Sequence, residues 1–158
     1  MKKEIPIKKN GYRPKDAILR VVNLYILKKY ITMPTFSKTS KERLLTCHKD
    51  IQTLMNEVIK ITNITILCGH REQIEQDKAF REGKSKFKWP KSKHNTNPSK
   101  AIDIAPYPIN WDDVDGFIEL STIVKNTWYD LKSSGKVTET LYWGGDWRTF
   151  KDMPHYEL

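Results

Sequence analysis

Residues 92–108 read SKHNTNPSKAIDIAPYP, and this stretch holds the turn signals and the extended segment around which the chain is organised. In its second half, small and β-branched residues alternate, so an extended backbone places Ile102 and Ile104 on one side and Asp103 on the other, between two alanines. The isoleucines are candidates for the core, and the small neighbours leave space beside the carboxylate. The stretch therefore predicts a strand that carries an acidic side chain in a confined position.

The residues before this stretch predict two helices and a second strand. Apolar side chains recur at helical spacing after a polar start and continue to the end of residues 37–60, which predicts one long amphipathic helix. The β-branched run 61–68 stops at a glycine and is typical of a strand. Residues 72–83 are helix formers ending on a glycine, and the basic, turn-rich residues 84–100 predict an exposed loop.

The residues after it predict a third amphipathic helix and a short hairpin. The helix begins with acidic residues near Trp111, runs to Leu131 and ends at Gly135. The tail 140–158 is rich in aromatic residues, and its Gly144-Gly145 pair is expected to form the hairpin turn. Helices and short strands together indicate an α+β domain.

Length and composition favour a single globular domain. The chain has 158 residues, which is enough for one hydrophobic core but short for two independent ones. Its composition, 38% hydrophobic and 30% charged, is typical of a globular protein. We interpret residues 1–36 as a basic extension with a helix from Asp16, and residues 37–158 as the domain. The apolar run 17–27 contains Arg20 and an asparagine, so we expect neither a secretory signal nor a membrane span and predict synthesis in the cytoplasm.

The net charge of +9, from 28 Lys and Arg against 19 Asp and Glu, concentrates the protein near polyanions. Nucleic acid, an anionic membrane surface and acidic wall polymers all qualify, and charge does not choose among them. Phe87 and Trp89 lie among lysines and could stack on bases, which makes nucleic-acid binding the leading non-enzymatic alternative. Cys47 and Cys68 form no CxxC pair, so we expect reduced thiols and no thiolate metal knuckle.

Three residues could hold a catalytic metal. A catalytic zinc takes three protein ligands and leaves a position for water or substrate, and His94, Asp103 and His155 supply that number. Each also has an ordinary interpretation, as a surface histidine or as an acid paired with a neighbouring lysine. Two histidines and a carboxylate would also suit iron or cobalt.

Asp152 and Arg71 could complete such a site. A plain strand would put Asp152 and His155 on opposite faces, so both reach one site only through a bend, which Pro154 could provide. Asp152 would then take a proton from the attacking water and pass it to the leaving amine. Arg71 could bind a substrate carboxylate or stabilise an oxyanion, or it could simply pair with a nearby glutamate. No GxSxG turn, phosphate loop or HExxH helix offers a competing scheme.

Taken together, SKH at 92–94, AID at 101–103 and DMPH at 152–155 resemble the zinc D-alanyl-D-alanine carboxypeptidase and L-alanyl-D-glutamate endopeptidase (VanY-like) family, whose pattern is SxHxxGxAxD followed by [ED]xxH. With GHR at 69–71, Gln76 and the tail, the resemblance covers roughly 37–158. The stretch SKHNTNPSKAIDIAPYPINW is most similar to the phage endolysin branch.

The resemblance implies a small antiparallel sheet with flanking helices, Hedgehog/D-Ala-D-Ala-peptidase-like. It implies a zinc-dependent endopeptidase that hydrolyses the L-alanyl-D-glutamate bond of cell-wall stem peptides and causes bacterial lysis after release from the cytoplasm. By position it implies zinc ligation by His94, Asp103 and His155, a base in Asp152, substrate or transition-state contact by Arg71, and a site-shaping hydroxyl in Ser92. The expected partners are peptidoglycan stem peptides and anionic wall polymers, with no nucleic acid.

Two departures from the family pattern stand out. His94 and Asp103 are nine residues apart where seven is commoner, and the usual glycine is missing. Because lengthening a loop costs only ~0.6 kcal/mol per doubling, we expect the residues between them to absorb the insertion. His70 stands where an aromatic residue is frequent. Cleavage of a terminal D-alanyl-D-alanine bond on the same zinc site, and a non-catalytic basic module, remain the alternatives.

Overall fold

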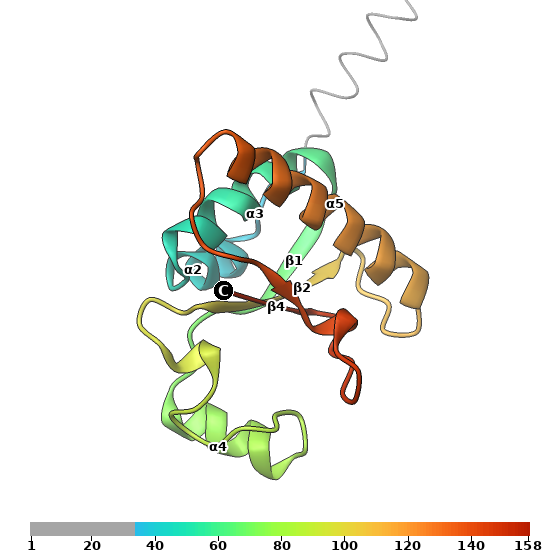
Figure 1. Cartoon of the computed structure of the whole chain (residues 1–158). Coiled ribbons are helices and arrows are strands. Elements are labelled where there is room, and N and C mark those ends of the chain that lie inside the picture. The colour runs from blue at the N-terminus through green and yellow to red at the C-terminus, as the bar shows by residue number, and fades with distance from the viewer. Residues whose placement is uncertain (1–33) are drawn as a thin grey trace, which may run out of the picture. The chain divides into compact units, whose positions relative to one another are not determined.

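The computed structural model describes residues 34–158, so the helix expected from Asp16 lies outside the described residues. Its centre is a four-stranded antiparallel sheet with strand order β1-β2-β4-β3 (Figure 1). The strands are β1 (Ile64–Cys68), β2 (Ala101–Pro106), β3 (Tyr142–Trp143) and β4 (His155–Glu157). The expected α+β class with a small antiparallel sheet is confirmed. Within residues 34–158, no helix has the length and apolar character needed to cross a membrane.

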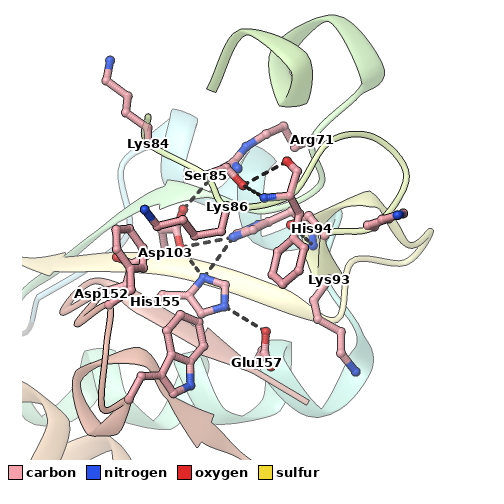
Figure 2. Close-up of a pocket in the computed structure, with 15 residues that line it drawn as sticks. Arg71, Lys84, Ser85, Lys86, Lys93, His94, Asp103, Asp152, His155 and Glu157 are labelled. Carbon is pink, nitrogen blue, oxygen red and sulfur yellow. Dashed lines mark hydrogen bonds and ion pairs between the residues drawn. The ribbon is translucent and has the colours of Figure 1, made fainter. Parts of the chain in front are cut away.

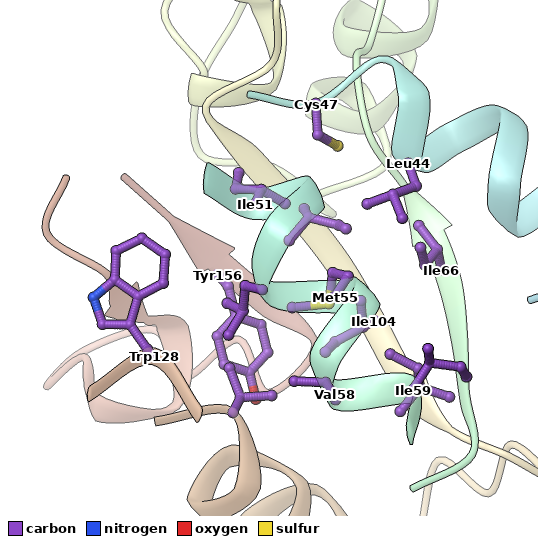
Figure 3. Packing of buried hydrophobic residues seen from close by; sticks show 14 of the residues in the cluster. Leu44, Cys47, Ile51, Met55, Val58, Ile59, Ile66, Ile104, Trp128 and Tyr156 are labelled. Atoms are coloured by element: carbon purple, nitrogen blue, oxygen red, sulfur yellow. The ribbon is translucent and has the colours of Figure 1, made fainter. Parts of the chain in front are cut away.

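Three helices, α2 (Lys38–Leu45), α3 (Lys49–Ile61) and α5 (Val114–Ser133), lie on one side of the sheet (Figure 1). A fourth helix, α4 (Gln73–Arg81), lies on the other side, with the connection that leads to β2. The core forms between the sheet and α3 and α5 (Figure 3). Its fully buried members include Ile51, Leu54 and Val58 of α3, Ile66 of β1, Ile102 and Ile104 of β2, and Val124 of α5. The predicted inward side of β2 is therefore confirmed.

The single long helix expected over residues 37–60 is wrong, because the chain breaks between α2 and α3. Thr46 Oγ1 donates to the Arg43 carbonyl at 2.7 Å, and the His48 ring caps α3 by accepting from the Asp50 N–H at 3.2 Å. The break also lets the backbone around Cys47 pair with Ser99, just before β2. Apolar spacing cannot reveal this break, since both helices present apolar side chains to the same core.

Two glycines end helices as their positions predict. Gly83 follows α4 with φ +72°, and Gly135 follows α5 with φ +70°, a left-handed conformation that residues with a Cβ rarely adopt. The tail differs from expectation in its turn. β3 and β4 do pair, but Gly144 and Gly145 start a short 3₁₀ helix, and a long connection to β4 follows. That connection carries residues of the cavity described below.

A buried carboxylate ties α3 to the segment before β3. Asp50 Oδ2 accepts from the backbone N–H groups of Thr138 at 2.7 Å and Glu139 at 3.1 Å. Burial would raise the pKa of Asp50, but these hydrogen bonds outweigh it and hold the pKa below its usual range. The ionised carboxylate is therefore the form that stabilises the fold.

We expect Asp50→Ala to lower the free energy of unfolding by about 1–3 kcal/mol, because two backbone donors lose their acceptor. The folded pKa lies below the unfolded value of about 3.9, so this stabilisation is present at neutral pH and is lost as the pH falls through the folded pKa. Urea unfolding of the wild-type protein and of the variant between pH 3 and pH 7 measures both effects, as the difference between the two proteins at each pH. Asp130→Ala, on the exposed side of α5, is the control and should change little; equal losses in both variants would contradict the role of Asp50.

Candidate metal centre and active site

Strand β2 brings Asp103 into line with residues of both neighbouring strands. Asp103 pairs with His155 of β4 on one side and with Cys68 of β1 on the other. A β-bulge between Ile66 and Cys68 makes the second pairing, because it adds one residue to β1 opposite β2. Without the bulge Leu67 would stand opposite Asp103, so the bulge turns Cys68 toward the carboxylate.

His94 comes from the short 3₁₀ helix η1 (Lys93–Asn95), which lies in the connection before β2. Ser92 caps η1, since its hydroxyl oxygen accepts from the His94 N–H at 3.3 Å. The Asn95 amide donates to the Arg71 carbonyl at 2.9 Å, and the Arg71 N–H donates to the His94 carbonyl at 2.9 Å. The segment predicted as an exposed loop is thus folded here, with Ser92, His94 and Asn95 buried.

Three side-chain atoms of these residues meet at one point (Figure 2). His94 Nε2 lies 3.2 Å from Asp103 Oδ1 and 3.3 Å from His155 Nδ1, and His155 Nδ1 lies 3.0 Å from Asp103 Oδ1. We call this set the His94–Asp103–His155 triangle. Ligands at about 2.0–2.1 Å from a tetrahedral zinc stand roughly 3.3 Å apart, so the spacing fits a metal of that size.

The outer nitrogen of each histidine faces an acceptor. His94 Nδ1 lies 2.7 Å from the Gly69 carbonyl oxygen, and His155 Nε2 lies 3.1 Å from Glu157 Oε2. The hydrogen bond from His155 lowers the pKa of Glu157, which keeps that carboxylate ionised. With a proton on each outer nitrogen, both inner nitrogens present a lone pair to the centre of the triangle, where a cation could bind. Such outer partners orient and strengthen metal-binding histidines.

The electrostatics of the triangle favour a positive charge at its centre. Burial disfavours the charged ring of His94, but Asp103 outweighs burial and raises the pKa of His94 to about 10. Burial likewise opposes ionisation of Asp103, yet the two histidines hold its pKa well below the usual range. A site that attracts a proton this strongly also attracts a metal cation, and the chemistry of the three donors suits zinc.

Arg71 binds the far side of Asp103. Its Nη2 donates to Asp103 Oδ2 at 3.2 Å, while its Nη1 donates to Gln76 Oε1 at 3.2 Å. The two carboxylate oxygens are thus divided, Oδ2 to the arginine and Oδ1 to the histidines. The pairing of Arg71 with a nearby glutamate, left open by the sequence, is not the arrangement found within residues 34–158.

Asp152 reaches the same place through the bend expected at Pro154. The His155 N–H donates to the Asp152 carbonyl at 3.1 Å, which closes a turn just before β4. The turn packs tightly on Gly144, where a Cβ would lie 2.4 Å from the Asp152 carbonyl oxygen. Burial and the negative charge of Asp103 both raise the pKa of Asp152, so its carboxylate takes up a proton more readily than an ordinary aspartate.

All six residues predicted for the site line one cavity of about 180 Å³: Arg71, Ser92, His94, Asp103, Asp152 and His155. Their roles stay predictions, but the structure brings them together. Trp147 and Phe150 form an aromatic wall, and lysines 84, 86, 91 and 93 form a basic one. His70 does not belong to this lining; its ring bonds Thr96 and Glu72 instead.

The longer spacing between His94 and Asp103 does not keep their side chains apart, since His94 Nε2 lies 3.2 Å from Asp103 Oδ1. Thr96, Asn97 and Pro98 are exposed, and the Lys100 N–H donates to the Lys93 carbonyl at 3.1 Å, which closes the loop. The extra residues therefore extend into solvent.

Sequence reasoning missed Glu157, Cys68 and a role for Gln76. Glu157 stands two residues after His155 on a strand and so shares its face, a signal that was available. Cys68 gave no signal, because only the bulge turns it toward Asp103. Its sulfur, with one ligand atom each of His94 and Asp103, forms a second cluster within 4.8 Å that could hold a metal. We favour the His94–Asp103–His155 triangle because its atoms lie closer together and both histidine rings are oriented by acceptors.

The sequence model of a family described as phage L-alanyl-D-glutamate peptidase matches residues 33–157, which include every residue of the triangle. The chain belongs to this family. The stated resemblance to L-alanyl-D-glutamate endopeptidases is thereby confirmed.

Two relatives of known identity agree with the family assignment. A peptidoglycan L-alanyl-D-glutamate endopeptidase of Bacillus subtilis, CwlK, is 32% identical over 61% of this chain and 60% of its own length. The chain thus matches less than two thirds of that relative. The crystal structure of the Serratia marcescens L-Ala D-Glu endopeptidase ChiX superposes with a TM-score of 0.65, at 24% identity, over 81% of this chain and 92% of the other. The latter likeness supports the fold.

Proposed function

We propose that this family member is a zinc-dependent endopeptidase that hydrolyses the L-alanyl-D-glutamate bond of peptidoglycan stem peptides and serves in bacterial lysis. The observation that carries the proposal is the convergence of His94 Nε2, Asp103 Oδ1 and His155 Nδ1 within 3.0–3.3 Å in a cavity that also holds Asp152. Family membership and the activity for which the Bacillus relative is named support the choice of bond.

The proposed ligands are His94, Asp103 and His155, with Gly69 and Glu157 as their outer partners. A zinc ion bound by these residues would supply Lewis-acid chemistry, that is, polarisation of the scissile carbonyl and a lower pKa of the attacking water. The protein contributes rigidity, because two ligands lie on paired strands and the third lies on a helix joined to Arg71 by one backbone hydrogen bond and by the Asn95 amide.

Asp152 is the proposed general base. Its raised pKa lets it take a proton from the attacking water and return that proton to the amine that leaves as the peptide bond breaks. Arg71 places a positive charge beside the triangle, where negative charge grows on the carbonyl oxygen during attack. Ser92 acts indirectly, by capping the helix that carries His94.

Digestion of purified peptidoglycan tests the proposed bond. The zinc-loaded protein should clear a wall suspension and release fragments that begin with D-glutamate, identified by mass spectrometry after labelling of new amino groups. Release of single D-alanine residues would replace the proposal with a carboxypeptidase on the same site. A non-catalytic binding module would produce neither product, and the Asp152→Asn protein serves as the inactive reference.

A further inference from the structure

The lysines in the basic wall of the cavity differ in their contacts. Lys84 pairs with Glu82 at 2.7 Å and Lys93 donates to the Leu158 main-chain oxygen at 2.8 Å; both point away from the triangle in Figure 2. Lys86 lines the same cavity as Asp103 and His155. Its ammonium stands 4.6 Å from the centre of the Phe150 ring, and within residues 34–158 it has no carboxylate partner.

Phe150 restrains this ammonium without neutralising it. A cation over an aromatic face is attracted by the ring quadrupole and keeps its full charge. The cavity holds three acids, Asp103, Asp152 and Glu157, and within residues 34–158 none of them forms an ion pair with Lys86; Asp103 is bound by Arg71 and the histidines, and Glu157 by His155. Lys86 is therefore a positioned, unpaired cation at the edge of the proposed reaction centre.

The backbone around Lys86 is held by a buried amide. Gln76, fully buried, donates from Nε2 to Ser85 Oγ at 2.9 Å and to the Phe87 carbonyl at 2.6 Å, the two neighbours of Lys86. The oxygen of the same amide accepts from Arg71. The Gln76 side chain thus holds the segment 85–87 and Arg71 in fixed positions relative to each other.

The proposed substrate offers a matching anion. A glutamyl residue has two carboxyl groups, and one of them takes no part in the bond to L-alanine or in the next bond of the stem. That group is a carboxylate when free and neutral when converted to an amide. A carboxylate placed against an unpaired ammonium gains a charge-assisted hydrogen bond, whereas an amide leaves the cation without its counter-ion.

We propose that Lys86 binds this free carboxylate and makes the enzyme selective for stem peptides whose glutamyl residue is not amidated. The inference rests on the proposed function and adds to it a chemical distinction between two forms of the same peptide. Lys86 acts as a substrate-binding residue, on the side of the cleaved bond that carries the glutamyl group.

Two synthetic stem peptides, identical except for a free or an amidated glutamyl carboxyl group, test the proposal on the full zinc-loaded chain. The wild-type protein should cleave the free form with a kcat/KM about ten- to a hundredfold higher, the usual worth of a hydrogen bond to a charged group. Lys86→Gln should lose that factor for the free peptide, largely through KM, and leave the amidated peptide unchanged. Lys86→Arg should keep most of the preference.

Lys84→Gln is the matched control, because Lys84 lies two residues away on the same segment and points away from the triangle. It should retain the wild-type preference. Equal rates on both peptides for the wild-type protein, or an equal loss on both in Lys86→Gln, would overturn the role of Lys86 while leaving the proposed function in place. Failure to cleave either peptide would instead overturn the proposed function, and this inference with it.

Discussion

Asp152→Asn is expected to keep its zinc and to lose about 10²–10⁴-fold in kcat. An amide has nearly the shape of the carboxylate but cannot accept the proton of the attacking water. Zinc should stay because Asp152 lies outside the His94–Asp103–His155 triangle, whose atoms are 3.0–3.3 Å apart. Elemental analysis of the purified variant and cleavage of a stem peptide under saturating conditions measure the two quantities.

The Asp152 carboxylate should also make the rate of cleavage depend on pH. Because burial and Asp103 raise the pKa of Asp152, the acid limb of kcat/KM should lie above the ordinary aspartate value of about 3.9. The base is active when ionised, so the rate falls as the pH drops through this raised pKa. Zinc content measured at each pH separates this effect from loss of the metal.

Asp146→Asn is a suitable control for Asp152→Asn. Asp146 is an exposed acid in the same connection between β3 and β4, and it pairs with Lys125 at 2.7 Å. Its substitution should change neither zinc content nor turnover. If Asp152→Asn lost zinc and activity in parallel, Asp152 would be a ligand; if it kept full turnover, another group would be the base.

His155→Ala is expected to lose both zinc and activity, whereas Cys68→Ala keeps both. His94 and Asp103 belong to the triangle and also to the cluster with Cys68, so only these two substitutions separate the alternatives. Removing a ligand should cost more than the roughly 10- to 100-fold in affinity that loss of an outer partner costs. Competition with a chelator of known affinity gives the zinc dissociation constants.

Thermal unfolding provides an independent readout of the same pair. A metal that binds only the folded chain raises the melting temperature, so added zinc should stabilise the wild-type protein and Cys68→Ala but not His155→Ala. Circular dichroism checks that His155→Ala, which removes a buried ring, is still folded. The reverse pattern, with zinc lost from Cys68→Ala alone, would move the metal to the Cys68 cluster.

The strands and helix ends that could be predicted depend only on residues close together in the sequence. Ile102 and Ile104 alternate with small residues, so the side of β2 that carries the isoleucines faces the core whichever strands β2 pairs with. Gly83 and Gly135 end their helices through a left-handed conformation that depends on one residue. The break between α2 and α3 was missed because both helices present apolar side chains to the same core, so the apolar spacing continues across the break.

The residues of the candidate site also fall into those that the sequence predicts and those that it does not. Six of its residues were identified from motif order and donor chemistry, and the turn at Pro154 from the stereochemistry of proline. Cys68 and Lys86 were not identified. Cys68 is turned toward the site by a bulge in β1, and the Lys86 ammonium lies over Phe150, which belongs to the connection between β3 and β4. Neither arrangement can be recognised from the residues that adjoin Cys68 or Lys86 in the sequence.

The chain's residues alone identify the family motif, the donor atoms for a metal and the face of β2 that is buried, because each follows from side-chain chemistry or from the period of a strand. Tertiary structure alone decides which atoms meet. The antiparallel register sets His155 beside Asp103, the bulge adds Cys68 on the other side, and buried Gln76 joins Arg71 to the segment that carries Lys86. These contacts join residues far apart in sequence, and they form only when the sheet and its connections pack.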